Sequence, residues 1–390
     1  MPMAQLAVPE YALFLSSFLS FFWVSGLVQH WLSSAPDPVA PDIILPRLLF
    51  WFLVGTLFAA GLSVGIAYVR GLPLLPLLLF VVAIPIGSLL DILLYVRRKH
   101  RQLLIFSVGY AILQVVLPAA AWWVFQQEEA VLWAMGIVAA SKAIYCLGES
   151  SFFRQLSFSS STHFGFLVSA SPLLLSFFLS GLPEFSDAFI VQYFLGAEDF
   201  VRYRYGAREF PVMMLVSATF STAMVLAVAR NLSVGLQDIR HQSARLMHLF
   251  FPLSAILMLL APLAYPFFFN NNFFVSAQVF NVYLLLAVPR LVFPQAIING
   301  MKKHHIILYS AAFELLLNIF LSILFLQLMG LPGVAVGTVL AYIADKVFLS
   351  LYLYFQEGIP PAAYIPIRLY GLYMLLLAAA FACQQLLFFY

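Results

Sequence analysis

The stretch that decides the fold is AVPRLVFPQAIINGMKKH at residues 287–304, because its pattern occurs twice in the sequence. Residues 83–100, an offset of 204, read AIPIGSLLDILLYVRRKH. In both copies a proline, Pro85 or Pro289, interrupts an apolar run that ends in a basic turn, RKH or KKH. The repeat predicts two structurally related halves that have the same orientation.

The composition predicts a polytopic membrane protein. Hydrophobic residues make up 64% of the 390 residues and charged residues 9%, whereas a soluble domain is about half apolar and a quarter charged. The net charge of +3 gives no sign of a nucleic-acid partner. Cys146 and Cys383 both lie in apolar segments far apart in the sequence, so we expect neither a disulfide framework nor a metal site, and no cofactor.

Apolar stretches of about 20 residues, the length of a membrane-spanning helix, recur along the chain. We expect an all-α protein with about twelve spans, near residues 9–31, 46–69, 72–95, 103–125, 130–148, 164–194, 199–229, 246–268, 275–299, 306–328, 332–355 and 365–388. The longest connections, 31–45, 149–163 and 230–245, are too short for a soluble domain. The expected domains are a five-helix lobe (1–155), a six-helix lobe (156–356) and an extra C-terminal helix (357–390).

The basic turns predict the orientation, because Lys and Arg are retained on the cytoplasmic side. Turn 97–101, the segment around 230–245 and turn 302–305 carry Arg or Lys and fall on one side of the predicted spans, whereas 126–129 and 270–272 carry none. We therefore expect these basic segments inside and the N-terminus outside.

Three stretches resemble the superfamily of multidrug, oligosaccharidyl-lipid and polysaccharide flippases, and among its branches the O-antigen flippases of polysaccharide biosynthesis. They are AVPEYALF at 7–14, DAFIVQYFLG at 187–196 running into YRYGAR at 203–208, and NIFL at 318–321 followed by GLPGVAVGT at 330–338. The motifs are degenerate and bear on fold more than on substrate.

The resemblance implies two six-helix lobes that alternate between inward and outward access. LAVPEYALF (6–14) is similar to LGAEDFVRY (195–203), which follows a full apolar span. The first copy follows almost nothing, so we expect the family's first helix to be missing from this sequence. The resemblance also implies residence in the bacterial inner membrane, a lipid-linked oligosaccharide as substrate, and a proton or sodium ion as coupling ion.

Charged residues inside the spans are the candidates for binding, because an ionised group at mid-membrane costs about 2.5–3.5 kcal/mol and needs a partner or water. In the second half these are Arg290, Glu314, Asp345 and Lys346. One interpretation is a polar, substrate-binding cavity between the lobes. The other is that Arg290 and Glu314, on consecutive helices, pair and lock the lobe.

Polar stripes provide two further candidates. Ser310, Glu314 and Asn318 recur at every fourth residue and share one helix face. Asp91 and Ser88 form a similar stripe in the first half. Such stripes in membrane spans line cavities or hold helices together.

Arg204 and Arg208 also lie four residues apart, in the densest basic patch outside the turns. Guanidinium groups bind phosphate through paired hydrogen bonds, and the lipid carrier of a glycan presents a pyrophosphate. The alternative is that these arginines extend to the outer membrane interface.

Transport is the expected activity, since no Gly-rich phosphate loop, HExxH motif or nucleophile elbow is present. The first alternative is a drug–cation antiporter of the same superfamily, which would need a buried carboxylate in the first lobe, where Asp91 is the candidate. A membrane polysaccharide polymerase or ligase is disfavoured, because every predicted outer loop is short.

Overall fold

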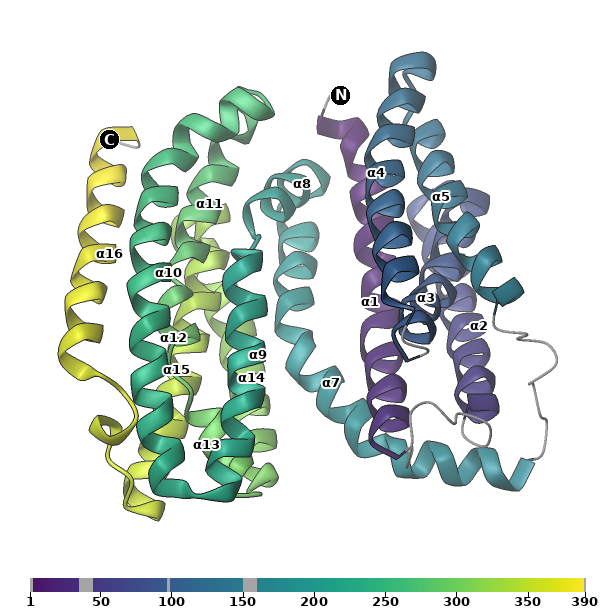
Figure 1. Ribbon diagram of the computed structural model, residues 1–390. Helices are drawn as coiled ribbons and strands as arrows, with labels where there is room; N and C mark the ends of the chain where they lie inside the picture. Colours follow the sequence, from purple (N-terminus) through teal and green to yellow (C-terminus); the bar gives the residue numbers. More distant parts are fainter. Residues whose placement is uncertain (1–2, 35–44, 97–98, 150–159, 389–390) are drawn as a thin grey trace. The chain divides into compact units, whose positions relative to one another are not determined.

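The computed structural model describes residues 3–34, 45–96, 99–149 and 160–388, which form α-helices, two single-turn 3₁₀ helices and no strand. The helices shown in Figure 1 are α1 (Met3–Ser34), α2 (Leu45–Arg70), α3 (Leu74–Val96), α4 (His100–Phe125), α5 (Glu128–Glu149), α7 (Ser160–Phe194), α8 (Ala197–Gly206), α9 (Pro211–Arg230), α10 (Leu232–Phe268), η1 (Asn271–Phe273), α11 (Phe274–Leu284), α12 (Ala287–Arg290), α13 (Pro294–Gly300), α14 (His304–Met329), α15 (Leu331–Glu357), η2 (Pro361–Ala363) and α16 (Ile367–Phe388).

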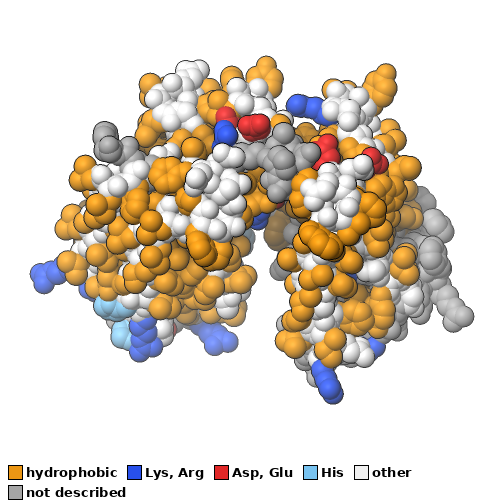
Figure 2. Space-filling model, turned by 90° about the horizontal axis from the view of Figure 1, so that it is seen from above, with side chains coloured by type: hydrophobic (Ala, Val, Ile, Leu, Met, Phe, Trp, Pro, Cys, Tyr) orange, Lys and Arg blue, Asp and Glu red, His pale blue; other side chains and the backbone are white. Residues whose placement is uncertain are grey.

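The predicted all-α polytopic membrane protein is confirmed. In the described residues, 11 helices are long and apolar enough to cross a membrane, or up to 12 if the two parts of α7 count as one broken span. Hydrophobic side chains cover most of the face shown in Figure 2. Large apolar side chains such as Trp123 (81% exposed) and Phe267 (83%) stand outside the core, where hydrocarbon rather than water is the favourable solvent.

The chain divides into two compact units, Met1–Gly181 and Leu182–Tyr390. In the first, α3 packs against α2 and α5, and α1 contacts all three of these helices. In the second, α14 packs along α15, and α10 lies beside α16 (Figure 1). The boundary falls inside α7, whereas the sequence placed the second lobe from residue 156. That lobe assignment and the internal repeat remain predictions.

Most of the predicted connection at 230–245 is helical, because the residues from Leu232 onward form the first part of the 37-residue helix α10. The Asn231 side chain caps this helix by accepting a hydrogen bond from the backbone N–H of Val234 at 3.2 Å. One face is buried at every fourth residue: Gly235, Ile239, Ser243 and Met247. Arg240 and Arg245 therefore lie on a helix with one apolar face, which a search for uniformly apolar spans overlooks.

The predicted span 275–299 is a broken helix, formed by α11, α12 and α13. Pro289 lacks an N–H, and Pro294 begins α13 after the non-helical link 291–293. Non-helical backbone at membrane depth occurs only where it is enclosed by protein or lines a water-filled cavity. Pro85, by contrast, lies within the continuous helix α3. Pro172 lies within α7, which bends by 45° between its parts Phe164–Leu179 and Gly181–Phe194.

Two glycines allow α14 and α15 to pack closely. Gly330 makes the turn between them with a φ of 67°, in the left-handed region. At Gly337 a Cβ atom would lie 2.6 Å from the backbone N of Ser322, so only a hydrogen fits there. This contact brings the polar residues of the two helices together.

Candidate functional site

Asp187, on α7 in the second unit, lies in a cage of hydroxyl groups. Its side chain is fully buried, and Oδ1 accepts a hydrogen bond from Ser322 at 2.8 Å. Oδ2 accepts from Thr338 and, at 3.2 Å, from Tyr203. No Lys, Arg or His of the described chain forms an ion pair with this carboxylate. Hydroxyl groups and the amide of Asn318, rather than a cation, therefore surround this carboxylate.

Further oxygen atoms surround this cage. The backbone carbonyl of Val334 is the alternative acceptor for the hydroxyl of Thr338, at 3.1 Å, and for that of Ser322, at 3.4 Å. Asn318, a predicted site residue, donates to Thr338 at 3.4 Å, and its Oδ1 accepts from Ser186 at 2.8 Å. The predicted polar face of α14 therefore extends, through Asn318, to the hydroxyl groups around Asp187. The position has the composition of a site for a proton or a hard cation.

Arg290 forms its ion pair with Glu209 and not with Glu314, the partner that one interpretation of the sequence gave it. Nη2 lies 2.5 Å from Oε1, and Nε lies 3.0 Å from Oε2. The guanidinium also lies 4.8 Å from the ring centroid of Tyr342 and donates to its hydroxyl at 3.3 Å. The planar guanidinium of Arg can form two bonds to a carboxylate while it stacks on an aromatic ring. The ammonium group of Lys does not match this geometry.

Four charged residues surround Glu184 on α7. The charges of Arg204, Arg208, Glu209 and Arg290 are all close enough to act on its carboxylate. Glu184 and Arg208 are exposed, and Arg204 is half-buried. These charges form a partly exposed cluster on the second unit, and Arg204 and Arg208 lie between the candidate spans that end at Phe194 and begin at Pro211.

Asp345 and Lys346 form a separate ion pair on α15. Asp345 is fully buried and accepts a hydrogen bond from Lys346 at 2.9 Å, one from Gln295 at 3.5 Å and one from Ser310. Glu314 is buried nearby, within reach of both charges and of Arg290.

The facing sides of α14 and α15 join these groups. On α14 the buried polar residues follow at every fourth position: Ser310, Glu314, Asn318 and Ser322. On α15, Thr338 bonds to Asn318, Asp345 bonds to Ser310, and Tyr342 lies within electrostatic reach of Glu314. The helix pair therefore carries a continuous polar face from the Asp187 cage to the Asp345–Lys346 pair.

Asp91 lies in the first unit and is neutralised there. Lys142 donates to its Oδ2 at 2.6 Å and lies 4.6 Å from the ring centroid of Tyr110. The Asp91 side chain is 38% exposed, and Gln114 donates to the Tyr110 hydroxyl at 2.7 Å.

The structure thus brings together the predicted residues Arg290, Glu314, Asn318, Asp345 and Lys346, with Arg204 and Arg208 beside Glu184. Sequence reasoning missed Glu184, Asp187, Glu209 and Tyr342. The sequence could have identified two of them, because Glu184 and Asp187 are the only acidic residues in the predicted apolar span 164–194.

Comparison with known proteins identifies the fold. No protein-family model and no curated protein matches the sequence. Solved structures do match. The lipid II flippase MurJ, in an inward closed conformation, aligns with a TM-score of 0.66 and 14% identity over 98% of this chain and 91% of that chain.

Transporters of the MATE family match as well. A MATE protein in the straight conformation aligns with a TM-score of 0.57 and 13% identity over 92% of this chain and 89% of that one. An outward-facing multidrug resistance transporter of the MATE family aligns at 0.55 and 15%, over 91% and 85%. The chain therefore has the fold of the multidrug, oligosaccharidyl-lipid and polysaccharide flippase superfamily, to which these structural neighbours belong. The expected resemblance is confirmed at the level of fold.

Proposed function

We propose that the chain is a transporter that flips a lipid-linked oligosaccharide across the bacterial inner membrane by alternating access. The observation that carries the proposal is the partly exposed cluster of Arg204 and Arg208 beside Glu184. Guanidinium groups bind phosphate through paired, charge-assisted hydrogen bonds, which strengthen where less solvent screens the charge. A pyrophosphate-linked sugar supplies such a group, while its lipid stays in the bilayer.

Arg290 extends this binding surface. Its present partner, Glu209, occupies the fork that a phosphate would use, in the bidentate geometry typical of both anions. In the proposal the phosphate displaces Glu209 when substrate binds. Glu184 sets the resting charge of the surface and keeps the two outer arginines from binding any small anion tightly.

The coupling ion binds at Asp187. An unpaired, fully buried carboxylate is costly unless a cation neutralises it, and the surrounding ligands are all oxygens of hydroxyl, amide and carbonyl groups. A proton or a sodium ion fits this chemistry. Since Ser322 and Thr338 come from two different helices, ion binding tightens the α14–α15 pair around α7.

A drug–cation antiporter is the second candidate, because one structural neighbour is a multidrug resistance transporter. In the first unit Asp91, the carboxylate expected for such an antiporter, is paired with Lys142, although the same unit also buries Glu10 at 7% exposure. The charged cluster in the second unit contains more arginines than acids. This excess of arginines favours an anionic substrate.

Selectivity in reconstituted vesicles separates the two functions. Purified protein is placed in liposomes that contain a fluorescent polyprenyl-pyrophosphate disaccharide, and movement between leaflets is followed by quenching from outside. A parallel set measures efflux of ethidium, a lipophilic cation. Flipping of the disaccharide lipid without ethidium efflux supports the proposal, whereas ethidium efflux alone establishes the antiporter.

A further inference from the structure

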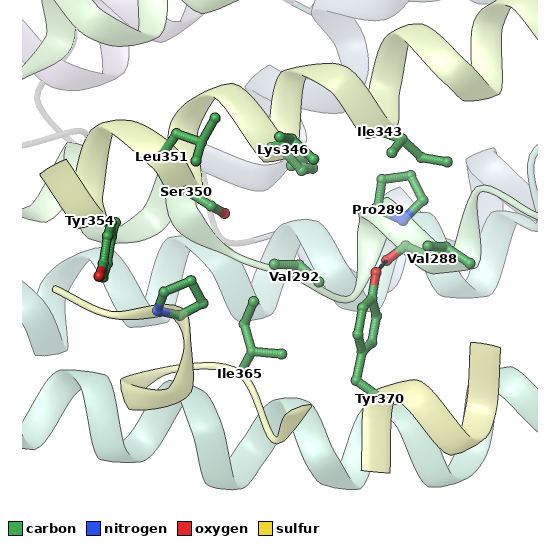
Figure 3. A pocket seen from close by; sticks show the side chains of 12 residues that line it. Val288, Pro289, Val292, Ile343, Lys346, Ser350, Leu351, Tyr354, Ile365 and Tyr370 are labelled. Carbon is green, nitrogen blue, oxygen red and sulfur yellow. Dashed lines mark hydrogen bonds between the residues drawn. The ribbon is translucent and has the colours of Figure 1, made fainter. Parts of the chain in front are cut away.

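A cavity in the second unit has one charged lining residue, Lys346 (Figure 3). Its volume is about 460 Å³, within the range of small-molecule sites. Three segments form its walls: the break in the α11–α13 helix, α15, and the C-terminal segment that leads into α16. Val288, Val292, Ile343, Val347 and Leu351 make it almost wholly apolar.

The cavity is part of the folded architecture. Tyr370 of α16 donates its hydroxyl to the backbone carbonyl of Val288 at 3.1 Å, the dashed line in Figure 3. The break in the helix leaves that carbonyl without its usual partner four residues on. A second cavity, of about 360 Å³, shares Val288 and Ile343 with the first and continues along α16.

Lys346 belongs both to this cavity and to the buried ion pair. Its side chain is 13% exposed, and its Nζ reaches back to Asp345, the preceding residue. Consecutive residues on a helix do not face each other, so the lysine stem bends around the helix to make this bond. Because the stem is long and flexible, Nζ reaches a ligand in the cavity by rotation alone.

Separation of the pair leaves Asp345 without a cation. Ser310, Gln295 and Lys346 bond to it, and the charge of Glu314 on α14 acts on it. Arg290 and Tyr342 interact with Glu314. Arg290 is already bonded to Glu209. A buried carboxylate in these surroundings is neutralised most readily by a proton.

We propose that the cavity binds an amphipathic anion, an alkyl chain with one negatively charged group, and that Lys346 exchanges Asp345 for this group. Asp345 takes up one proton from water as the exchange occurs, so the ion pair Asp345–Lys346, the anion and a proton give neutral Asp345 and a Lys346–anion pair. The apolar walls hold the chain. Anion binding at this site is thereby coupled to proton uptake.

Hexanesulfonate tests the exchange, because a sulfonate keeps its charge at every pH used. Binding to the purified protein in detergent is measured by titration calorimetry in two buffers of different ionisation enthalpy, which gives the protons taken up. 1-Hexanol and inorganic sulfate serve as the chain without charge and the charge without chain. We expect hexanesulfonate to bind about tenfold or more tightly than either, with uptake of about one proton.

Variants assign the roles. Lys346→Gln combined with Asp345→Asn leaves no unpaired buried charge, and should reduce hexanesulfonate binding to the level of hexanol. Asp345→Asn alone should keep binding and lose proton uptake, whereas Glu314→Gln should keep both.

Val347→Trp, at a half-exposed position of the wall, should block the cavity. Lys303→Gln removes a lysine that pairs with Glu357 outside the cavity and should bind like the parent protein.

The exchange is contradicted if the parent protein binds hexanol as tightly as hexanesulfonate, which identifies a simple apolar groove, or if it binds neither. Unchanged binding in the double variant removes Lys346 from the site. Binding without proton uptake, or uptake that depends on Glu314 instead of Asp345, excludes Asp345 as the group that takes up the proton. The measurement needs no flipping activity, so its result is independent of the proposed function.

Discussion

Arg290 and Glu209 are 81 residues apart in the sequence, yet their side chains form a two-bonded ion pair, with Nη2–Oε1 at 2.5 Å and Nε–Oε2 at 3.0 Å. The pair connects α12, in the broken helix, to the segment between α8 and α9. Both side chains are largely shielded, with 28% and 16% exposed. Loss of one partner therefore leaves a poorly solvated charge.

A double-mutant cycle on this pair should show strong coupling. We expect Arg290→Gln and Glu209→Gln each to lower the free energy of unfolding by about 1–3 kcal/mol, and the double variant to cost clearly less than the sum. Thermal unfolding in detergent measures the three values. The control pair, Arg202 and Asp199 on α8 (2.6 Å), is more exposed and should couple by less than about 1 kcal/mol. Additive losses at Arg290 and Glu209 would show that the two bonds contribute nothing to stability.

Asp187→Asn should abolish the response of transport to its driving ion gradient. Asparagine keeps the size of the side chain and one acceptor oxygen, while its NH2 group can donate to hydroxyl oxygens of the cage once they reorient. It lacks the charge that a proton or sodium ion neutralises. Flipping rates are measured with an imposed proton gradient and, separately, an imposed sodium gradient. The parent protein should respond to one of the two, which names the ion. A variant that still responds to that gradient would exclude Asp187 as the coupling residue.

Gly337→Ala should separate α14 from α15. Its Cβ would meet backbone atoms of Leu321 and Ser322 at 2.6–2.8 Å, and overpacking of this kind costs about 1–3 kcal/mol. The midpoint of thermal unfolding should fall accordingly. Gly371→Ala on α16, where no atom lies within 4 Å of the added carbon, is the matched control and should leave the midpoint unchanged or raise it, because alanine favours a helix over glycine. Equal midpoints for both variants would contradict the close packing described here.

The sequence predicted the fold class and five residues of the polar site in the second unit, but not their partners. Arg290 and Glu314 stood out because a charge in an apolar run is conspicuous. Glu209 did not, because it lies in a short segment between helices, and only the folded chain brings it to Arg290. Similarly, Asp187 gains its meaning from hydroxyl groups on α8, α14 and α15, which no local pattern connects.

The basic turns predict which side of the membrane each connection occupies, and a single cysteine tests this. Lys99→Cys, in a chain whose Cys146 and Cys383 are replaced by serine, should resist an impermeant maleimide added to intact cells, because the positive charges predict a cytoplasmic turn before α4. Detergent permeabilisation should then allow labelling. Labelling of intact cells would invert the topology.

The central claim is that Arg204 and Arg208 hold the charged head of a lipid-linked glycan, and the flipping rate of a polyprenyl-pyrophosphate disaccharide in proteoliposomes tests it most directly. The account predicts flipping by the parent protein and a loss of about tenfold or more in the Arg204→Gln/Arg208→Gln variant, because two charge-assisted contacts are removed. Arg202→Gln, on the same helix but bonded to Asp199, should flip at the parental rate. A parental rate in the double variant, or no flipping by any of the three proteins, would contradict the account.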